Sequence, residues 1–531
     1  MVSVKFPVPL VFAAAVLSPD VTAHSHVHPQ VHRTMRAQGT VNLIVTLKDS
    51  TESVLESVKE AEFATRGARI TSLVEKLQAH AKTARHRYTS CSIQAATTSA
   101  ESAPLFKSKT SFWISNQMHF EGATFELVEK LSTLDSVAET HEEQVLPLPE
   151  PIVSSANASK SAEESVGLPE EYQNQRGVAK IDALEVWAKG YTDQGVVVGV
   201  IETGVLGTHL ALENSFRGGA HSWYDPAKKT NAPTDDLGHG THAMGTIVGD
   251  FGIGIAPGAK WMVCRGCATA VDGCVEADLI KCGQFMLCPT NSAGKNADCT
   301  KAPHLVSNSW GSRDQEPFNS YTKIVDAWIA AKIIPIFAVE NSGPRCGTTR
   351  SPGDLTTVIL VDSTTNEDGL SPFSSKGPTT KNYPKPKITA PGTNVMSAWS
   401  TGIQAYQMVS RTSMATLHIS GAVALLLSVR PGLTYEEVRD ALFTTTKRLA
   451  LKPSNSTCGG RKDSSVPNNA YGYGRVNALA AVTKLLARPL PTPAPVPKPL
   501  TTDRCAGLSE LLCGEFLCDW ADSSAICSSW F

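Results

Sequence analysis

The 531-residue sequence has almost no excess of either charge. Its 48 lysine and arginine residues nearly balance its 50 aspartate and glutamate residues, which gives a formal net charge of -2. The basic residues are scattered along the chain, and the sequence has neither a basic stripe nor an acidic tail. Proteins that bind nucleic acid usually concentrate positive charge in such stripes or patches. We therefore expect no nucleic acid among the partners of this chain.

The sequence also lacks an apolar segment that would favour a membrane span. Its N-terminal apolar stretch, residues 6–17, is too short to cross a bilayer and contains Pro7 and Pro9. One lysine precedes this stretch, and the small residues VTA at 21–23 follow it, which is the pattern of a secretory signal peptide. We predict a signal peptide at 1–23, a protein secreted to the extracellular space, and no membrane partner.

The residues that would complete a structural zinc site are missing around Cys264 and Cys267. These two cysteines form a C-x-x-C motif, but no second pair or histidine stands at the required spacing. The chain has 13 cysteines, and one of them, Cys91, lies alone in a segment that we expect to be removed. An even remainder in an exported protein indicates disulfides, whose pairing the sequence leaves open. Two glycosylation sequons, at Asn157 and Asn455, fit the same export.

The composition changes along the chain in a way that predicts five segments. After the signal peptide, residues 24–165 combine β-rich runs such as TVNLIVTL with helical apolar spacing, which is typical of a small α+β domain. In residues 166–486, β-branched apolar runs alternate with helix-like stretches. This alternation indicates an α/β fold, a three-layer sandwich in which helices cover both faces of a mostly parallel central sheet. Residues 487–503 form a proline-rich linker, and the four cysteines of residues 504–531 indicate a small disulfide-rich module.

Within the α/β segment the apolar runs predict individual elements. We expect strands near residues 196–201, 260–264, 304–310, 333–339 and 357–361. We expect helices near residues 240–249, 274–287 and 321–332, and a helix from residue 412 that stops at Pro431-Gly432. Because this last stretch is apolar nearly all round, it predicts a buried central helix. Thr434 and Glu437 have the spacing of a capping box that opens the next helix.

Three segments supply the side chains that are needed for attack on a peptide bond. Glu202 ends a predicted strand, His239 lies in DDLGHGTH, and Ser413 lies in RTSMATLHISG at the start of the predicted buried helix. A serine hydroxyl becomes a good nucleophile when a histidine takes its proton and a carboxylate holds that histidine in the right tautomer. A serine at a helix N-terminus also places its backbone N–H beside the oxyanion that develops on the substrate.

The motifs around these residues resemble those of the subtilase superfamily of subtilisin-like serine proteases. GVIETGV resembles the family's D-T-G segment, GHGTHAMG its H-G-T-H segment, AVENSGP its G-N-S-G segment and TSMATLHISG its G-T-S-M-A-T-P-H segment. SNSWG, FSSKGP and APG match as well, and the resemblance covers residues 40–485. It implies an extracellular endopeptidase that acts on protein or peptide substrates and is made as an inhibited precursor.

Position by position, the resemblance implies Ser413 as the nucleophile, His239 as the general base and Glu202 as the carboxylate that orients it. The side-chain amide of Asn341 would donate to the oxyanion together with the Ser413 N–H. His242 is interpreted as structural. No cofactor is required for this chemistry, no metal ligands can be assigned, and a structural calcium ion stays an open expectation.

The resemblance also implies the surroundings of the site. Ser309, Trp310 and Gly311 would lie beside the substrate as a β-ladder partner, a common way of capturing an extended peptide. Residues 24–165 would be a propeptide that assists folding and acts as an intramolecular inhibitor, with EQVLPLP across the cleft until it is cut. We expect the protein to be a monomer.

Four residues depart from the family's active-site motifs. Glu202 replaces an aspartate, Glu340 the glycine before Asn341, Arg411 the glycine before Thr-Ser, and Leu417 a proline. Glutamate adds about 1.5 Å of reach, and a misplacement of about 1 Å in a catalytic group can cost roughly a hundredfold in rate. Leucine is well tolerated in a helix. The two glycine replacements predict backbone strain or a filled cleft, because glycine often marks positive φ or close approach of the backbone.

Glu340 and Arg411 carry opposite charges and flank residues of the predicted oxyanion hole and nucleophile. They are therefore expected on one rim of the specificity pocket, as substrate-binding residues. If Glu340 and Arg411 pair across the pocket, the pocket is partly filled. It then accepts small substrates, substrates with a neighbouring acidic residue, or none. If Glu340 instead faces an open pocket, it favours a lysine or arginine before the scissile bond.

Two functions follow from the sequence. The first is an active serine endopeptidase, and the second is a catalytically impaired pseudoprotease scaffold that acts by binding protein. The chain keeps the serine, the histidine and the asparagine that the chemistry needs. This complete set favours the active enzyme.

Overall fold

The computed structural model describes residues 26–88, 104–148, 152–153, 174–268, 273–312 and 319–488. The chain divides into a compact unit, Met1–Leu486, and a second unit, Ala487–Phe531. The predicted signal peptide, the boundary predicted at residue 165, nearly all of the linker and the whole cysteine-rich module lie outside the described residues.

A seven-stranded parallel sheet lies at the centre of residues 174–486, in the order β15-β14-β13-β12-β8-β10-β9. Its strands are almost entirely buried, which explains why their apolar residues come in continuous runs rather than in alternation. The predicted α/β class with a parallel sheet is confirmed. The strands are β8 (Val197–Glu202), β9 (Trp223–Tyr224), β10 (Lys260–Arg265), β12 (Leu305–Asn308), β13 (Ile334–Ala338), β14 (Ile359–Thr364) and β15 (Ile388–Pro391).

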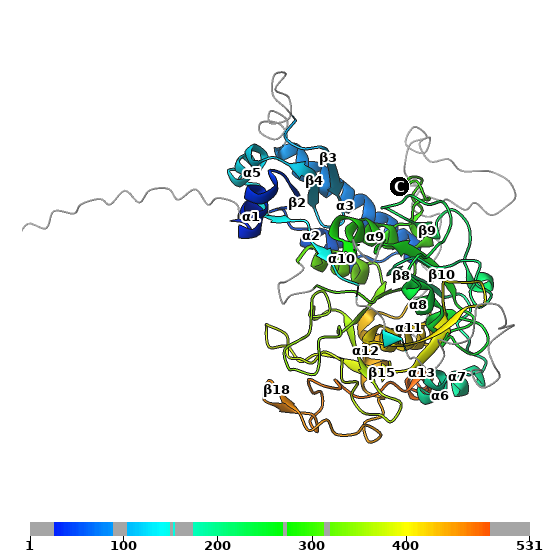
Figure 1. The fold of residues 1–531 in the computed structure, drawn as a ribbon. Coiled ribbons are helices and arrows are strands. Elements are labelled where there is room, and N and C mark those ends of the chain that lie inside the picture. The colour runs from blue at the N-terminus through cyan, green and yellow to red at the C-terminus, as the bar shows by residue number, and fades with distance from the viewer. Residues whose placement is uncertain are drawn as a thin grey trace, which may run out of the picture. The chain divides into compact units, whose positions relative to one another are not determined.

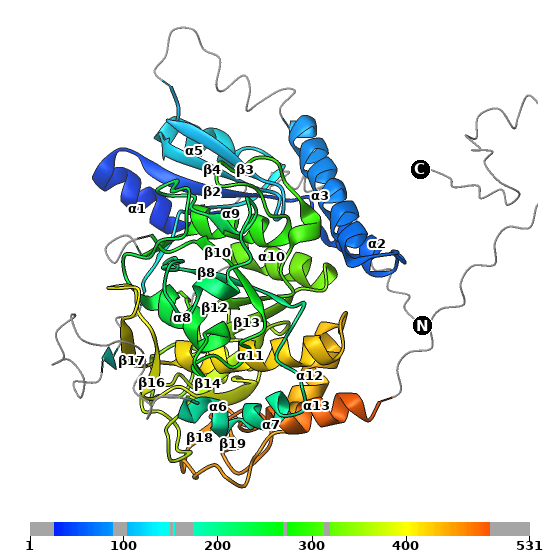
Figure 2. The same cartoon turned by 90° about the vertical axis from the view of Figure 1, so that its right-hand side faces the viewer.

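Helices cover both faces of this sheet (Figures 1 and 2). One face carries α8, α11, α12 and α13, and the other carries α9 and α10. Each face has its own apolar core, and neighbouring strand residues such as Val200 and Ile201 contribute to opposite cores. The helices are α6 (Arg176–Lys180), α7 (Ala183–Trp187), α8 (His239–Val248), α9 (Glu276–Leu287), α10 (Asn319–Ala330), α11 (Thr412–Val429), α12 (Tyr435–Phe443) and α13 (Ala478–Leu486).

The predicted central helix is confirmed as α11, which packs against α8, α13 and five strands of the sheet. Among the described helices it is the one long and apolar enough for a membrane span, but it is buried inside the protein. Its apolar circumference is therefore that of a core helix. The predicted capping box of α12 is also confirmed, because the Thr434 N–H donates to Glu437 and the Glu437 N–H donates to the Thr434 hydroxyl.

Strand order reverses around β8, which lies between β10 and β12. The chain runs from β8 to β10 on one side and then returns to β12 on the other side. In open parallel sheets, ligands bind beyond the carboxyl ends of the strands at such a reversal. Glu202 is the last residue of β8 and so lies at this point.

Residues 26–148 form a second sheet with the order β1-β5-β2-β4-β3. Apart from the parallel pair β1 and β5, its strands are antiparallel, as expected for a small α+β subdomain. We call this part the N-terminal subdomain. Its elements are β1 (His26–Val27), α1 (Pro29–Gln38), β2 (Val41–Leu47), α2 (Glu52–Lys59), α3 (Arg66–Tyr88), β3 (Ser108–Phe112), β4 (Gln117–Ala123), α5 (Phe125–Ser132) and β5 (Val137–Glu142).

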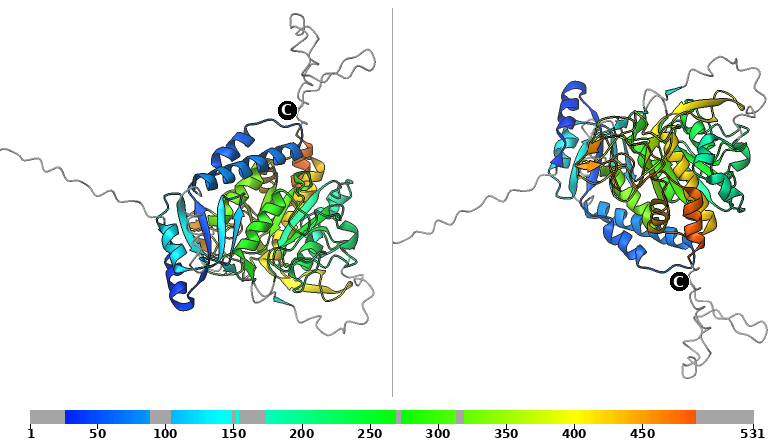
Figure 3. Two further views of the ribbon diagram at one scale, coloured as in Figure 1. Left: turned by 90° about the horizontal axis from the view of Figure 1, so that it is seen from above. Right: turned by 90° about the horizontal axis from the view of Figure 1, so that it is seen from below.

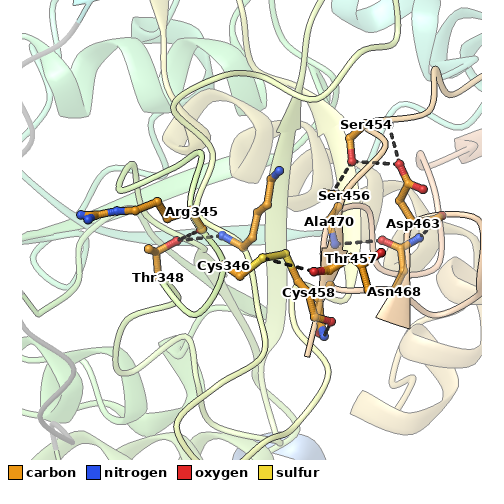
Figure 4. The surroundings of a disulfide bond; sticks show 12 residues. Arg345, Cys346, Thr348, Ser454, Ser456, Thr457, Cys458, Asp463, Asn468 and Ala470 are labelled. Atoms are coloured by element: carbon orange, nitrogen blue, oxygen red, sulfur yellow. Dashed lines mark hydrogen bonds between the residues drawn. A yellow bond between two sulfur atoms is a disulfide. The ribbon is translucent and has the colours of Figure 1, made fainter. Parts of the chain in front are cut away.

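Four disulfides are present in the described residues, where all eight cysteines are paired: Cys264–Cys282, Cys267–Cys274, Cys288–Cys299 and Cys346–Cys458. The prediction of disulfides rather than zinc is confirmed there. Figure 4 shows that Cys346–Cys458 joins the loop after Asn341 to the hairpin of β18 (Thr457–Cys458) and β19 (Arg461–Lys462).

The N-terminal subdomain packs on the face of α9 and α10 (Figures 2 and 3). Apolar side chains of both parts share one core, for example Leu77 and Phe285. At the centre of this contact, the buried Glu276 carboxylate lies 3.0 Å from His141 Nε2 and accepts a hydrogen bond of 2.9 Å from the Gln144 N–H. Burial opposes charge on His141, but the Glu276 charge and hydrogen bond prevail and raise the pKa of His141.

We expect Glu276→Gln to weaken this contact by about 3 kcal/mol, because it leaves a buried histidine without its counter-ion. A raised His141 pKa stabilises the folded state fully below the ordinary value of 6.5 and progressively less as the pH rises through the raised value. The loss should therefore be larger at pH 6 than at pH 9. Urea unfolding in a Ser413→Ala background measures it.

The matched control is Glu129→Gln, which neutralises an exposed glutamate of α5 in the same subdomain. It should change the stability little at either pH. An equal loss for Glu276→Gln at both pH values would show that His141 is not its partner in solution.

Candidate active site

Glu202 ends β8 with its carboxylate buried and directed at the first residue of α8. Its Oε2 lies 2.8 Å from His239 Nδ1 and accepts a weaker hydrogen bond of 3.3 Å from the Thr203 N–H. The side chain is 1% exposed, and Oε1 has no hydrogen-bond partner within the described residues. The extra methylene of glutamate is thus accommodated without loss of the contact to His239.

His239 is held in place by Asp235, a residue that the sequence analysis passed over. Asp235 Oδ1 accepts hydrogen bonds from the Thr203 hydroxyl and from the Leu237 and Gly238 N–H groups, at 2.9 to 3.0 Å. Its Oδ2 accepts from both the N–H and the hydroxyl of Thr241. Asp235 therefore ties the residue after β8 to the first turn of α8. The signal available in the sequence was an aspartate just before a G-H-G turn, where a carboxylate can cap a helix.

The electrostatic surroundings of His239 favour its charged form. Burial opposes the charge, but the Glu202 charge and hydrogen bond, with smaller effects of Asp235 and Glu340, raise the pKa of His239 above its ordinary value of 6.5. A neutral His239 that accepts a proton would therefore be stabilised as an imidazolium by Glu202.

Ser413 is the second residue of α11, and it is 1% exposed. The N–H groups of the first turn of a helix have no intrahelical acceptor, so they can bind a negative charge. Just before it, the Thr412 N–H and hydroxyl both donate to Asn341 Oδ1 at 3.0 Å. These two bonds fix the amide of Asn341, whose Nδ2 is buried and has no acceptor within the described part of the chain. The Asn341 Nδ2 and the Ser413 N–H are therefore two donors suited to an oxyanion.

The structure brings Glu202 and His239 into contact, but it shows no hydrogen bond from Ser413 Oγ to His239 Nε2 among the described residues. The helices that carry them, α8 and α11, pack against each other. In enzymes without substrate, catalytic hydrogen bonds are often long and tighten only in the substrate complex.

The two glycine replacements behave differently from one another. Glu340 has φ 78°, in the left-handed region, so the predicted strain is present there. Arg411 has φ -168° and ψ 167°, an extended conformation that any residue adopts, so the strain predicted at this position is absent. No ion pair joins the two residues where the structure describes them, and the Arg411 guanidinium lies 5.9 Å from the ring centre of Phe373. Leu417 is buried within α11.

The Glu340 side chain lies against Gly311 instead. A Cβ atom at Gly311 would lie 3.0 Å from Glu340 Cγ and Oε1, tighter than ordinary contact. Ser309 and Trp310, which precede Gly311, are buried at the end of β12. A larger residue at 311 would therefore require the Glu340 side chain to shift by a few tenths of an ångström.

The chain that follows the N-terminal sheet contains two short strands, and each of them pairs with a strand near the site. β6 (Val145–Leu146) pairs with β11 (Cys274–Val275), and β7 (Ile152–Val153) pairs with the end of β17 (Tyr406–Ser410). The family resemblance implies Ser309–Gly311 as the ladder partner, but the sequence gives no signal for β11, because a two-residue strand has no periodicity.

The described residues contain no cluster of three or more His, Cys, Asp or Glu side chains able to hold a metal ion. The expectation of a structural calcium ion stays untested. His242 Nε2 contacts the backbone carbonyls of Val395 and Gln407, which joins α8 to β17 and to β16 (Val395–Ala398), and burial lowers its pKa to about 3. A neutral histidine in such contacts fits the structural role predicted for it.

Comparison with known proteins gives a consistent result. A family profile described as the subtilase family matches residues 193–474. Bacillopeptidase F of Bacillus subtilis (strain 168) is 37% identical over 328 residues, which are 58% of this chain but only 22% of that protein. Serine protease AprX of the same strain is 31% identical over 56% of this chain and 69% of its own length. Subtilisin Savinase of Lederbergia lenta is 28% identical over 57% of this chain and 97% of its own.

We expect Glu202→Gln to lower the pKa of His239, because it removes the negative charge nearest to the ring. Titration of the ¹⁵N-labelled imidazole by NMR, with the His239 signal assigned from a His239→Gln variant, measures the change. Glu213→Gln, which neutralises an exposed glutamate, is the control and should leave the titration where it is. An unchanged His239 titration in Glu202→Gln would contradict the contact.

We expect Glu340→Gly to raise the free energy of unfolding by about 1 kcal/mol, since glycine adopts φ 78° without strain. Urea unfolding measures it. Glu367→Gly, at an exposed position outside the left-handed region, is the control and should be neutral or destabilising. A destabilised Glu340→Gly would mean that contacts of the side chain outweigh the strain.

Proposed function

The chain belongs to the subtilase family of serine peptidases, and from this premise we propose that it is an endopeptidase that uses Ser413, His239 and Glu202 as its catalytic triad. The observation that carries the proposal is the contact of 2.8 Å between Glu202 Oε2 and His239 Nδ1, which supports a glutamate in the position of the family's aspartate. Protein or peptide chains are the proposed substrates.

In the proposed reaction, Ser413 Oγ attacks the carbonyl carbon of the scissile bond while His239 Nε2 takes the hydroxyl proton. Glu202 stabilises the imidazolium and keeps the proton of Nδ1 directed at itself. The Asn341 Nδ2 and the Ser413 N–H donate to the oxyanion. His239 then protonates the leaving amine, and a water molecule releases the acyl group by the reverse sequence of proton transfers.

We further propose that the chain is secreted and that residues 24–165 are an inhibitory propeptide. The four disulfides support an oxidising compartment. The pairing of β6 with β11 and of β7 with β17 supports inhibition, because β17 ends directly before Arg411 and the Ser413 helix.

The proposal predicts self-processing. When the chain from residue 24 onward is produced in an oxidising host, the N-terminal subdomain should be cut from the wild type but stay attached in Ser413→Ala. Intact mass spectrometry measures the cut. Ser464→Ala, which changes an exposed serine far along the chain, is the control and should be processed as the wild type is.

Two outcomes would oppose the proposal. An uncut but folded wild type would favour the pseudoprotease scaffold, which would act by binding protein. A cut that is equal in Ser413→Ala would show that another protease makes it.

A further inference from the structure

Two segments from different parts of the fold meet at Gly311. On one side, the Glu340 side chain lies against it, with the Glu340 carbonyl accepting a hydrogen bond of 3.0 Å from the Ser375 N–H. On the other side, the Ser312 N–H donates to the Ser351 carbonyl at 2.8 Å, so residues 350–351 lie beside residues 311–312. This contact places Arg350 close enough to Glu340 for the two charges to interact. No motif in the sequence identified Arg350 as a candidate.

Three charged residues, Glu340, Arg350 and Arg411, therefore lie close together, and we call them the charged cluster. Both arginines, together with His239, act electrostatically on Glu340. Glu340 is 8% exposed, and its Oε1 has no hydrogen-bond partner within the described residues. The Nε and Nη1 atoms of Arg350 are also buried and, in the part of the chain that the structure describes, have no acceptor.

Buried polar groups without partners are rare in folded proteins, because each costs free energy that a ligand can recover. The charged cluster combines two permanent cations with one carboxyl group, and the Glu202 charge also acts on that carboxyl group. A lysine or arginine side chain of a substrate would be repelled by the two cations. A carboxylate would be attracted, and it could accept the unmatched hydrogen bonds of Arg350.

The cluster also lies next to the atoms that act on the scissile bond. Glu340 directly precedes Asn341, and Arg411 directly precedes Thr412 and the proposed nucleophile. The Asn341 amide and the Ser413 N–H receive the oxygen of the attacked carbonyl in the proposed reaction. In a bound substrate, the side chain nearest to the charged cluster is then that of the residue whose carbonyl is attacked.

We propose that the charged cluster is a specificity site for an acidic side chain, aspartate or glutamate, on the substrate residue directly before the scissile bond. This inference rests on the proposed function and names the substrate class of the same site. It replaces the expectation that Glu340 selects a basic residue, because that expectation did not include Arg350.

The protonation of Glu340 gives the proposal a second consequence. Burial raises the pKa of Glu340 to about 7, against the opposing effects of His239 on α8 and of Arg350 and Arg411, while Glu202 on β8 raises it further. A neutral Glu340 can donate a hydrogen bond to a substrate carboxylate, whereas an ionised Glu340 repels it. Preference for an acidic residue should therefore fall as the pH rises through 7.

The test uses the secreted chain and four peptides that differ only in the residue before the scissile bond: glutamate, glutamine, leucine or lysine. We expect kcat/KM to be about 10- to 100-fold higher for glutamate than for glutamine, the size of a charge-assisted hydrogen bond. The ratio of the two should decline between pH 6 and pH 8.5. Because both peptides use the same His239, its titration cancels in the ratio.

Three variants locate the effect. Arg350→Gln should remove most of the preference for glutamate over glutamine, and Glu340→Gln should keep that preference but abolish its decline with pH. Arg345→Gln removes an exposed arginine five residues from Arg350 and is the matched control, which should behave as the wild type does. Near-ultraviolet circular dichroism checks that the variants are folded.

Binding of the same peptides to Ser413→Ala from which an added protease has removed the proposed propeptide, measured by fluorescence anisotropy, separates this inference from the proposed function. If no peptide is cut but Ser413→Ala binds the glutamate peptide more tightly, and Arg350→Gln in that background abolishes the difference, the enzyme proposal fails and the acidic site stands. If peptides are cut with a preference for leucine or lysine, the acidic site is refuted and the enzyme stands. Absence of both cutting and selective binding would refute both.

Discussion

The hydrogen bond between Glu202 and His239 depends on three features of the chain. β8 must end at Glu202, α8 must begin at His239, and Asp235 must hold the two ends together. Asp235 does this with both carboxylate oxygens, which accept from Thr203 at the end of β8 and from Thr241 in α8. The Glu202 carboxylate reaches His239 from the end of β8, and Asp235 fixes the loop and helix that carry His239 relative to that end.

The rest of the site is assembled around this contact by the packing of α11. This helix is apolar all round, so it lies in the core next to α8, and its first turn is brought to the carboxyl end of the sheet. Asn341 follows β13 and is oriented by Thr412 of α11, so a single helix positions both proposed oxyanion donors. The cost of this arrangement is visible at Glu340, where a glutamate is held at φ 78° directly before Asn341.

Much of the fold was predictable because it depends on local or repeated signals. Buried parallel strands are apolar along their length, helices such as α9 and α11 have their own apolar spacing, and the Thr434 capping box depends on four residues. The family motifs likewise identified Glu202, His239, Asn341 and Ser413 as candidates.

The part that was not predictable depends on contacts between distant segments. The approach of Arg350 to Gly311, the pairing of the cysteines and the role of β11 all arise from such contacts. The backbone angles of Glu340 and Arg411 belong here too, since one glycine replacement is strained and the other is extended.

If glutamate completes a working triad, Ser413 should react with a fluorophosphonate. Such reagents react with a serine only when a neighbouring base activates its hydroxyl. The reaction does not depend on which peptide the enzyme prefers. We expect one label per processed molecule, on the peptide that contains Ser413, and slower labelling of Glu202→Gln. A folded, processed protein that stays unlabelled at Ser413 would contradict it.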